Sequence, residues 1–444
     1  MWHYPRLAIG TLGPRSEPNW VSLALMAAFR SAGFPIQSFR AEASFCRFPV
    51  APSICGRPVR HLDSWLMSRE KCQQIFGLAT RPDQLIVVDG HYGIPASITP
   101  GGRLDELCDW LDLPRLVVLD VEELDQCCLP KLPAKTDGIL FDRIRSRSQF
   151  RQLQTDLETV CGIPVLGALE PLPEVRSQLE RHTTDGACLR QWWEQLGRSF
   201  AEYWNREQLW RLATQRSWEP CREATLCAKR NLRVAVAFDQ AFNRYFPDVF
   251  TALEALGATL EHFSPLNDET LPAGTELVII GCGDVLRHLP ALANNHCMKA
   301  ALRHHVAAGF RIYAEGAGAA FLCQRIETPD GSKYPMAGLL PAVARWHQSS
   351  EPPQPVELRT RLASWLFPEN SCLRGYRNPC WCFQPAASAT GFVHQVEHRF
   401  DLIGCYRAVG SLVHLYFAAH SDLLAHFFDP CQAPPYLVDP WQPL

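Results

Sequence analysis

Residues 84–90 read QLIVVDG, in which four consecutive aliphatic residues are followed by an aspartate and a glycine. A short apolar run of this kind, bounded by turn residues, is typical of a strand buried on both faces of a parallel sheet. Similar runs occur at residues 6–10, 115–120, 138–142 and 163–167. Residues 21–31 and 146–160, which lie between such runs, have helical periodicity. This alternation predicts a first α/β domain over residues 1–183.

The same alternation restarts in the second half of the chain. The strands predicted there are residues 232–237, 276–281 and 310–314, and the predicted helices are 249–256 and 292–308. A second α/β domain is therefore expected over residues 232–444. The intervening residues 184–231 are rich in Trp, Arg, Glu and Gln and predict a helical segment, with one helix over 191–212, and a linker. The fold class is two doubly wound, mainly parallel-sheet α/β domains.

Composition excludes several classes of function. The 444-residue chain has 43 Lys and Arg against 46 Asp and Glu, and a net charge of −3 is no signature of nucleic-acid or anionic-membrane binding. Its apolar runs are too short to span a bilayer, and its first residues do not resemble a signal peptide. The 18 cysteines contain no C-x-x-C pair and are interpreted as small buried residues. We expect a cytoplasmic protein with no metal site and no nucleic-acid or membrane partner.

Six segments carry a resemblance to a known family. They are residues 56–67 (GRPVRHLDSWLM), 162–169 (GIPVLGAL), 233–248 (RVAVAFDQAFNRYFPD), 263–268 (FSPLND), 313–315 (YAE) and 335–341 (PMAGLLP). In these segments the chain resembles the cobyrinic acid a,c-diamide synthase family. The segments run in the order of the family's motifs, and they span nearly the whole chain.

The resemblance implies two modules with a joint activity. The first module is a P-loop ATP-binding domain similar to dethiobiotin synthetase, and the second is a class I glutamine amidotransferase domain of the triad type. In the family, ATP and Mg²⁺ serve to phosphorylate a carboxylate of a corrin ring, and ammonia from glutamine then replaces the phosphate. The resemblance also suggests a homodimer, or a heterodimer with an active family member.

The phosphate loop of the family is altered in this chain. Residues 10–20 read GTLGPRSEPNW and lack the Gly-Lys-Thr that cradles phosphates and holds Mg²⁺. Pro18 has no N–H to donate, and Glu17 would repel a phosphate. We therefore expect a degenerate phosphate loop, with no cofactor held in the family's usual way. The remaining candidate cofactor-binding residues are Gly10, Thr11, Gly13 and Asp89.

The acidic residues that serve Mg²⁺ and substrate placement in the family are also replaced. Their positions read Ser44 and Arg47, and an arginine at a metal-binding position should exclude the metal. The retained Asp63 has a structural and a functional interpretation, and both stay open. Asp89 matches the family's acidic residue at the end of a later strand, although a cap or turn role also fits it. The candidate substrate-binding residues are Asp63, Arg40 and Arg47.

The nucleophile of the glutaminase is missing from its usual position. The family motif Tyr-Ala-Glu-Cys-Gly-Gly reads YAEGAG at 313–318, so Gly316 stands in place of the nucleophilic cysteine and follows Glu315. Covalent attack on glutamine cannot occur at a residue without a side chain. Cys282 lies in the altered oxyanion-side loop, which reads GCGDVL at 281–286, and near the missing nucleophile, but we do not expect it to substitute, because it would sit on a different strand end. His414 keeps the position of the base and is expected to be a packed, hydrogen-bonded residue.

Scaffold motifs thus persist while three chemical motifs are replaced. The leading interpretation is a catalytically degenerate relative of the family, a pseudoenzyme that binds a tetrapyrrole of the corrinoid or sirohydrochlorin type or modulates an active partner. One alternative is an active ATP-dependent amidotransferase that uses free ammonia or a partner's glutaminase. Another alternative is a structural subunit of a complex.

Overall fold

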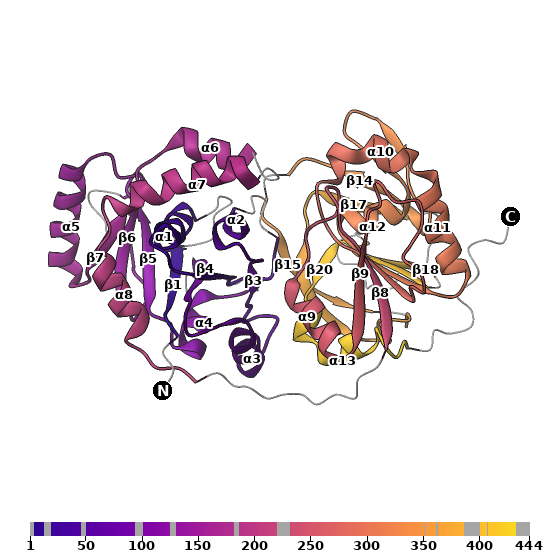
Figure 1. Ribbon diagram of the computed structural model, residues 1–444, viewed down its shortest axis with the longest axis horizontal. Helices are drawn as coiled ribbons and strands as arrows, with labels where there is room; N and C mark the ends of the chain where they lie inside the picture. Colours follow the sequence, from indigo (N-terminus) through magenta and orange to yellow (C-terminus); the bar gives the residue numbers. More distant parts are fainter. Residues whose placement is uncertain are drawn as a thin grey trace. The chain divides into compact units, whose positions relative to one another are not determined.

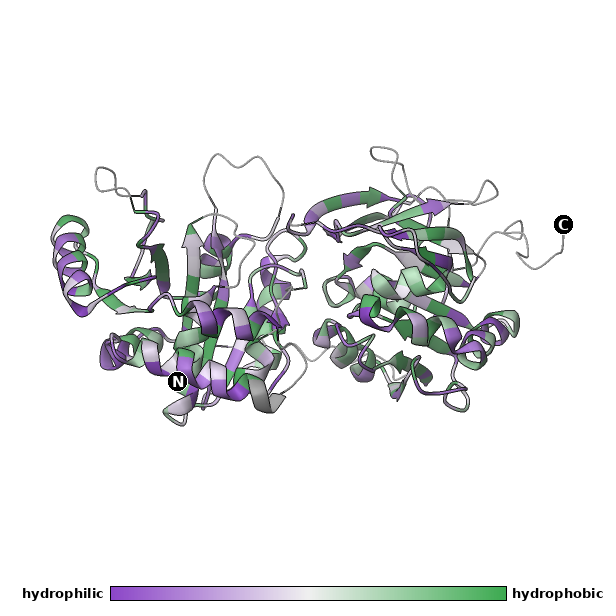
Figure 2. Cartoon of the chain, turned by 90° about the horizontal axis from the view of Figure 1, so that it is seen from above, coloured by the Kyte–Doolittle hydropathy of each residue, from purple (hydrophilic) through white to green (hydrophobic). Residues whose placement is uncertain are grey.

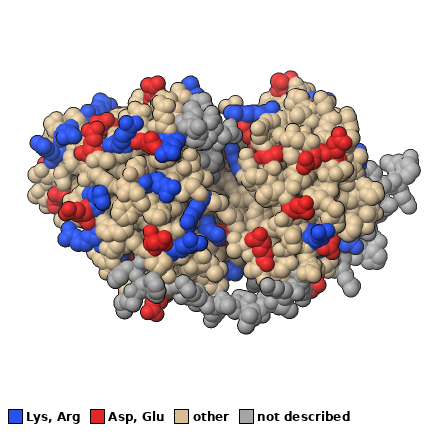
Figure 3. Space-filling model, in the orientation of Figure 1, with Lys and Arg blue, Asp and Glu red and all other residues tan. Residues whose placement is uncertain are grey.

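The computed structural model describes residues 4–12, 19–45, 50–93, 101–124, 130–181, 186–219, 231–349, 351–360, 363–385, 400–405 and 407–431. The chain divides into two compact units, Met1–Ala224 and Thr225–Leu444, which are coloured indigo to magenta and red to yellow in Figure 1. The sequence predicted a separate part over 184–231, whereas the helices of that part belong to the first unit. No helix within the described ranges is long and apolar enough to cross a membrane. On the face drawn in Figure 3, basic and acidic side chains are interspersed.

A seven-stranded sheet, parallel in all its pairings, forms the centre of the first unit, in the order β3-β2-β4-β1-β5-β6-β7. Its strands are β1 (Arg6–Leu12), β2 (Ile36–Arg40), β3 (Arg60–His61), β4 (Leu85–Tyr92), β5 (Arg115–Asp120), β6 (Gly138–Asp142) and β7 (Val165–Ala168). The apolar run at the start of β4 is fully buried, as expected for a strand covered on both faces. Because β1 lies beside β4, the carboxyl ends of these two strands meet at one edge of the sheet.

Helices cover both faces of this sheet. The helices described in this unit are α1 (Trp20–Ser31), α2 (Ala51–Cys55), α3 (Arg69–Ala79), α4 (Leu104–Leu111), α5 (Arg147–Cys161), α6 (Pro173–Arg181), α7 (Gly186–Ala201) and α8 (Arg206–Thr214). Leu7 and Ile9 of β1 share a core with α1 and α7, whereas Gly10, on the opposite face, meets Leu104 of α4. The predicted doubly wound α/β architecture is thereby confirmed.

The prediction of one helix over residues 191–212 is wrong. Helix α7 ends at Ala201 and α8 begins at Arg206. The break has a local cause at Asn205, whose side chain accepts from the N–H of Gln208 at 3.1 Å and so caps α8. The backbone N–H of Asn205 donates to the carbonyl of Leu166 in β7 at 2.8 Å. The break therefore fastens the helical pair to the sheet edge.

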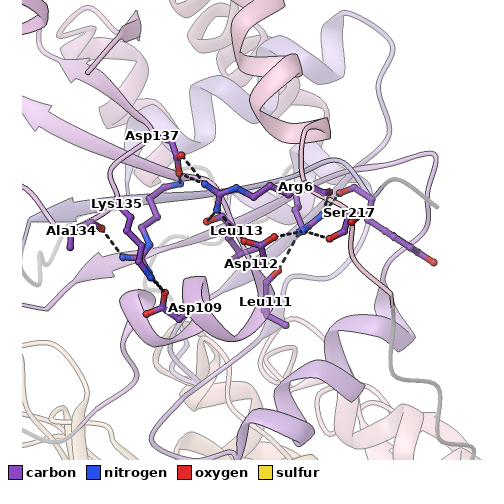
Figure 4. Close-up of polar contacts among 12 residues, drawn as sticks. Arg6, Asp109, Leu111, Asp112, Leu113, Ala134, Lys135, Asp137 and Ser217 are labelled. Atoms are coloured by element: carbon purple, nitrogen blue, oxygen red, sulfur yellow. Dashed lines mark hydrogen bonds and ion pairs between the residues drawn. The ribbon is translucent and has the colours of Figure 1, made fainter. Parts of the chain in front are cut away.

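A buried arginine attaches the segment after α8 to the sheet (Figure 4). Arg6 is fully buried in β1. Its guanidinium donates to the carbonyls of Leu111 at 3.2 Å, Arg216 at 2.9 Å and Ser217 at 3.3 Å. Burial lowers the pKa of Arg6 to about 10, and the carboxylate of Asp112, 3.6 Å away, opposes that change. The end of the first unit is thus held against its first strand.

The second unit has a six-stranded central sheet in the order β18-β19-β11-β10-β8-β9. Its strands are β8 (Leu232–Ala237), β9 (Ala258–Phe263), β10 (Leu277–Ile280), β11 (Arg311–Glu315), β18 (Leu402–Cys405) and β19 (Ala408–Ser411), and β18 alone pairs antiparallel. The helices described here are α9 (Pro247–Ala255), α10 (Leu289–Asn294), α11 (His296–Ala307), α12 (Ala317–Leu322) and α13 (Ser421–Ala425), with short 3₁₀ turns at Val285–His288 and Phe417–Ala419. The predicted helix over 292–308 is therefore two helices, with Asn295 capping the second.

Two smaller sheets of the second unit were not predicted from the sequence. One has the order β13-β12-β14-β17, and the other has the order β15-β16-β20. Their strands are β12 (Cys323–Glu327), β13 (Lys333–Pro335), β14 (Leu340–Trp346), β15 (Gln354–Arg359), β16 (Cys372–Arg377), β17 (Trp381–Pro385) and β20 (Val413–Leu415). Several of these strands mix polar and apolar residues, whereas the central strands are largely apolar (Figure 2). The smaller sheets matter for function because β20 carries His414.

Candidate functional site

The carboxyl edge of the first sheet holds the residues predicted to contact a nucleotide. Gly10 lies in β1, where a Cβ would come within 2.6 Å of the Tyr92 ring. The Tyr92 hydroxyl donates to the carbonyl of Leu116 at 3.1 Å, which ties β4 to β5. Gly10 therefore makes room for a buried tyrosine. Thr11 is buried one residue further along, and Gly13 lies outside the described residues.

Asp89 lies near the end of β4, beside the first turn of α1. Asn19 caps α1 by accepting from the N–H of Ser22 at 3.2 Å, and its side-chain amide donates to Asp89 Oδ1 at 2.8 Å. Burial raises the pKa of Asp89 to about 6, and the charge of Arg40 and the Asn19 hydrogen bond oppose that rise. One oxygen of the carboxylate is thus bound by a capping residue of the same chain.

Asp63 is fully buried, and backbone N–H groups bind its carboxylate. Oδ2 accepts from the N–H of Ala43 at 3.0 Å, and Oδ1 accepts from the N–H groups of Trp65 at 2.9 Å and Leu66 at 3.1 Å. A Cβ on Gly102 would lie 2.9 Å from Oδ2, so the backbone approaches this carboxylate closely. These contacts join the segment after β2 to the turn after β3. They favour the structural interpretation of Asp63.

Arg40 is the last residue of β2 and is in register with both Asp89 and His61. Burial lowers the pKa of His61 to about 3, and the Arg40 charge lowers it further. Arg40 therefore places a positive charge on the same edge as Asp89. Ser44 is fully buried, and Arg47 lies outside the described residues.

In the second unit, Gly316 joins β11 to α12 through a sharp turn. Its φ of 52° and ψ of −114° are a conformation that favours glycine. A Cβ at this position would lie 2.5 Å from the Sγ of Cys282 and 3.1 Å from Cε1 of His414. The sulfur of Cys282 therefore occupies the space that a side chain at 316 would need.

Cys282, Glu315 and His414 meet at this turn. Strands β10 and β11 are parallel neighbours, so the segment after β10, which contains Cys282, lies beside the end of β11. The Sγ of Cys282 lies 3.5 Å from Nδ1 of His414 and 3.4 Å from the carbonyl oxygen of Glu315. The exposed fractions of Cys282, His414 and Glu315 are only 6%, 2% and 8%. The reason for setting Cys282 aside, its different strand end, does not hold, because the two strands are adjacent.

The three side chains are electrostatically matched. Nδ1 of His414 lies 3.6 Å from Oε2 of Glu315. Burial alone would lower the pKa of this imidazole, but Cys282 and Glu315 raise the pKa of His414 to about 10. Glu315 is itself held by the N–H of Leu415 at 3.1 Å and the hydroxyl of Tyr313 at 2.5 Å. The arrangement places a positively charged imidazole within 3.5 Å of the Cys282 sulfur.

Sequence reasoning placed His414 and Glu315 correctly at this turn but did not assign Cys282 to it. The signal was the adjacency of two predicted parallel strands whose carboxyl ends share one edge. Other buried thiols differ in their surroundings, since burial raises the pKa of Cys323, whose Sγ donates to a helix carbonyl at 3.4 Å. Among the described side chains, no group of three His, Cys, Asp or Glu is arranged to hold a metal ion.

Known proteins are similar to this chain in part of the second unit and over most of its length. A CobB/CobQ-like glutamine amidotransferase domain matches residues 233–378. The chain is 29% identical to the cobyrinate a,c-diamide synthase of Syntrophotalea carbinolica, over 96% of this chain and 99% of that protein. It is 25% identical to the protein of the same name from Priestia megaterium, over 96% and 97%. A solved glutamine amidotransferase structure is 17% identical, with a TM-score of 0.34, over 44% of this chain and 97% of that one.

Proposed function

We propose, from the premise that this chain belongs to the cobyrinate a,c-diamide synthase family, that it binds a tetrapyrrole but does not activate its carboxylates with ATP. The observation that carries the proposal is the 2.8 Å hydrogen bond from Asn19 to Asp89. At this edge of a P-loop domain, a carboxylate and a hydroxyl help to hold Mg²⁺, and a lysine contacts the phosphates. Here Asn19 caps α1, and its side-chain amide donates to the carboxylate of Asp89.

The residues at this edge do not fit a magnesium nucleotide. Residues 10–20 contain no lysine, and Pro18 cannot donate an N–H. Asp63, the other retained acid, accepts three backbone hydrogen bonds within the fold. A carboxylate used in this way stabilises the protein rather than a metal ion. These features support a degenerate ATP site within a retained scaffold.

A tetrapyrrole ligand is supported by the relatives, whose names describe the synthesis of cobyrinate a,c-diamide. Rings of this class carry several carboxylates, and guanidinium groups bind carboxylates in a planar, two-pronged geometry. The proposed ligand is therefore a corrinoid or sirohydrochlorin-type polycarboxylate.

A basic groove in the first unit offers such a ligand a place to bind. The groove encloses 640 Å³, within the range of small-molecule sites. Its lining includes Arg30 at the end of α1 and Arg190 and Arg198 on α7. Arg190 pairs with Glu194 at 2.7 Å, whereas Arg30 and Arg198 have no ion-pair partner in the described part of the chain. Two unpaired guanidinium groups at one groove support binding of an acidic ligand.

The experiment combines binding and product formation. The full-length protein is mixed with cobyrinic acid or sirohydrochlorin, Mg-ATP, and glutamine or ammonium, and pigment absorbance and amidated product mass are recorded. We expect bound pigment and no amidated product. The double variant Arg30→Ala/Arg198→Ala should weaken pigment binding about tenfold or more. The matched control is Arg151→Ala, which removes an exposed arginine from α5.

The other outcomes decide between the remaining functions. Amidated product from ammonium would contradict the proposal and establish an active amidotransferase that uses free ammonia. Amidated product that appears only when an active relative is added would favour a modulating partner in a heterodimer. The absence of both pigment binding and amidated product would contradict the proposal and favour a structural subunit.

A further inference from the structure

We infer that Cys282 is a nucleophile that attacks a primary carboxamide, of the kind found in the glutamine side chain, in place of the cysteine absent from position 316. The inference goes beyond the proposed function, because it concerns the second unit and needs neither pigment nor nucleotide. It rests on three side chains, each more than nine-tenths buried, that converge from three separate strand segments. They are Cys282, Glu315 and His414.

The position of Cys282 is fixed by its backbone. The N–H of Cys282 donates to the carbonyl of Arg244 at 3.2 Å, and the N–H of Arg244 donates back to the carbonyl of Cys282 at 2.9 Å. The preceding Gly281 donates to the hydroxyl of Tyr245 at 3.0 Å. This two-way bridge holds the thiol at the end of β10. A nucleophile held in one orientation loses little entropy on reaction.

The base is held from a different sheet. His414 lies in β20, in register with Tyr376 of β16. Gly375 allows this close pairing, because a Cβ there would lie 2.3 Å from the carbonyl oxygen of His414. Oε2 of Glu315 lies 3.6 Å from Nδ1, the same ring nitrogen that faces the sulfur of Cys282 at 3.5 Å. A thiol, a base and a residue that orients the base are the parts of a nucleophilic triad.

The glycine at 316 and the cysteine at 282 depend on each other. With glycine at 316, the Sγ of Cys282 can occupy a place only 2.5 Å from where a Cβ would stand. A cysteine at 316 would collide with that sulfur. The sequence change that removes one thiol from the turn therefore makes room for another thiol at nearly the same point. The chemistry moves between adjacent strands while the base stays in place.

The reaction balances with water as the only co-reactant. The thiolate of Cys282 attacks the carboxamide carbon, a C–S bond forms and the C–N bond breaks. The imidazolium of His414 donates its proton to the leaving nitrogen, which departs as ammonia. Water then attacks the thioester and gives one proton to His414, the C–S bond breaks and restores the thiolate, and the carboxylic acid product passes its own proton to the released ammonia.

The pH dependence of the thiol follows from the groups that face it. Among the described residues these are His414, Glu315, Tyr313 and Tyr245. Burial raises the pKa of both tyrosines, so they stay neutral over the working range. The reactivity of Cys282 is then governed by its pairing with His414.

The test is site-resolved alkylation of the folded protein. Iodoacetamide is added at pH 5 to 9, and mass spectrometry measures modification at each cysteine. At pH 6 we expect Cys282 to react at least tenfold faster than Cys323. The variant His414→Ala, which removes the imidazole 3.5 Å from the sulfur, should slow the modification of Cys282 at least tenfold. The control variant Cys323→Ser, which removes a thiol that has no imidazole partner among its recorded contacts, should leave the profile unchanged.

A second assay reports the covalent intermediate. Glutamine and hydroxylamine are supplied without ATP, and glutamyl hydroxamate should form with the wild type and fall at least a hundredfold with Cys282→Ala. Circular dichroism checks that each variant is folded. A Cys282 that stays unmodified until the chain unfolds, or hydroxamate that persists in Cys282→Ala, would overturn the inference. Either result leaves pigment binding by the first unit intact, so the two proposals fail separately.

Discussion

The polar side chains at the carboxyl edges of the two central sheets have different kinds of partner. In the first unit, Asp89 accepts from Asn19 and Asp63 accepts from three backbone N–H groups, so the protein itself uses these carboxylates. In the second unit, Cys282 and Glu315 instead face the imidazole of His414. A retained acid is thus no sign of retained chemistry when the backbone binds its oxygens. A displaced thiol can keep the chemistry when the base stays in place.

The largest effect is expected from Asp63→Ala in the first unit. Removing the carboxylate leaves three N–H groups without their acceptor, and we expect a loss of about 4 kcal/mol in the free energy of unfolding. Urea denaturation measures it. The exposed Asp83 supplies the control, because Asp83→Ala should change stability by less than about 0.5 kcal/mol. If Asp63→Ala lost little stability but no longer bound pigment, Asp63 would serve the ligand. That result would contradict the contrast drawn between the two sheet edges.

The next effect concerns the exchange of thiols in the second unit. Gly316→Cys places a Cβ 2.5 Å from Sγ of Cys282 at a φ of 52°, and should cost about 3 kcal/mol. In the double variant Gly316→Cys/Cys282→Ala the collision is gone, so about 2 kcal/mol should return as coupling between the two sites. Urea midpoints of the four proteins complete the cycle. Additive costs would mean that the two positions do not compete for one space.

A smaller, pH-dependent effect is expected from Asp89→Asn. Because the folded pKa of Asp89 is raised to about 6, the stability that its protonated form contributes is lost as pH rises from about 4 through 6. At pH 7.5 the variant should therefore be more stable than the wild type by about 2 kcal/mol, after allowance for partial solvent contact. Below pH 4 the two should be equal. Thermal melts across this pH range measure the difference in stability. If Mg²⁺ stabilised the wild type but not Asp89→Asn, Asp89 would serve a working metal site, which would contradict the account.

The sequence predicted five strands of the first central sheet and three of the second, because these strands are nearly pure apolar runs, and it missed β2, β3, β9, β18 and β19. It did not predict β15, whose QPVELR alternates polar and apolar residues at a sheet edge. It also joined α7 to α8, since only the capping bond of Asn205 separates two stretches of equal helical propensity. Alternation is itself a strand signal, so β15 was missed because only apolar runs were interpreted as strands, whereas the separation of α7 from α8 depends on a contact that periodicity does not report.

The candidate site, like the fold, could be predicted from the sequence only in part. The family resemblance assigned Glu315, Gly316 and His414 to the altered glutaminase site, and the structure brings these three residues close together. The approach of Cys282 to His414 spans 132 residues and depends on strand order and on a third sheet. Whether Asp63 is structural depends on which N–H groups reach its oxygens, and residue type alone does not specify them.

The central claim is that the first unit has no nucleotide chemistry while the second keeps a thiol nucleophile at residue 282. The most direct measurement is one reaction with glutamine, cobyrinic acid and Mg-ATP in which glutamate and ADP are quantified together. The account predicts that glutamate forms without ADP and that Cys282→Ala abolishes the glutamate. ADP formed in proportion to amidated product, or glutamate that is unchanged in Cys282→Ala, would contradict it.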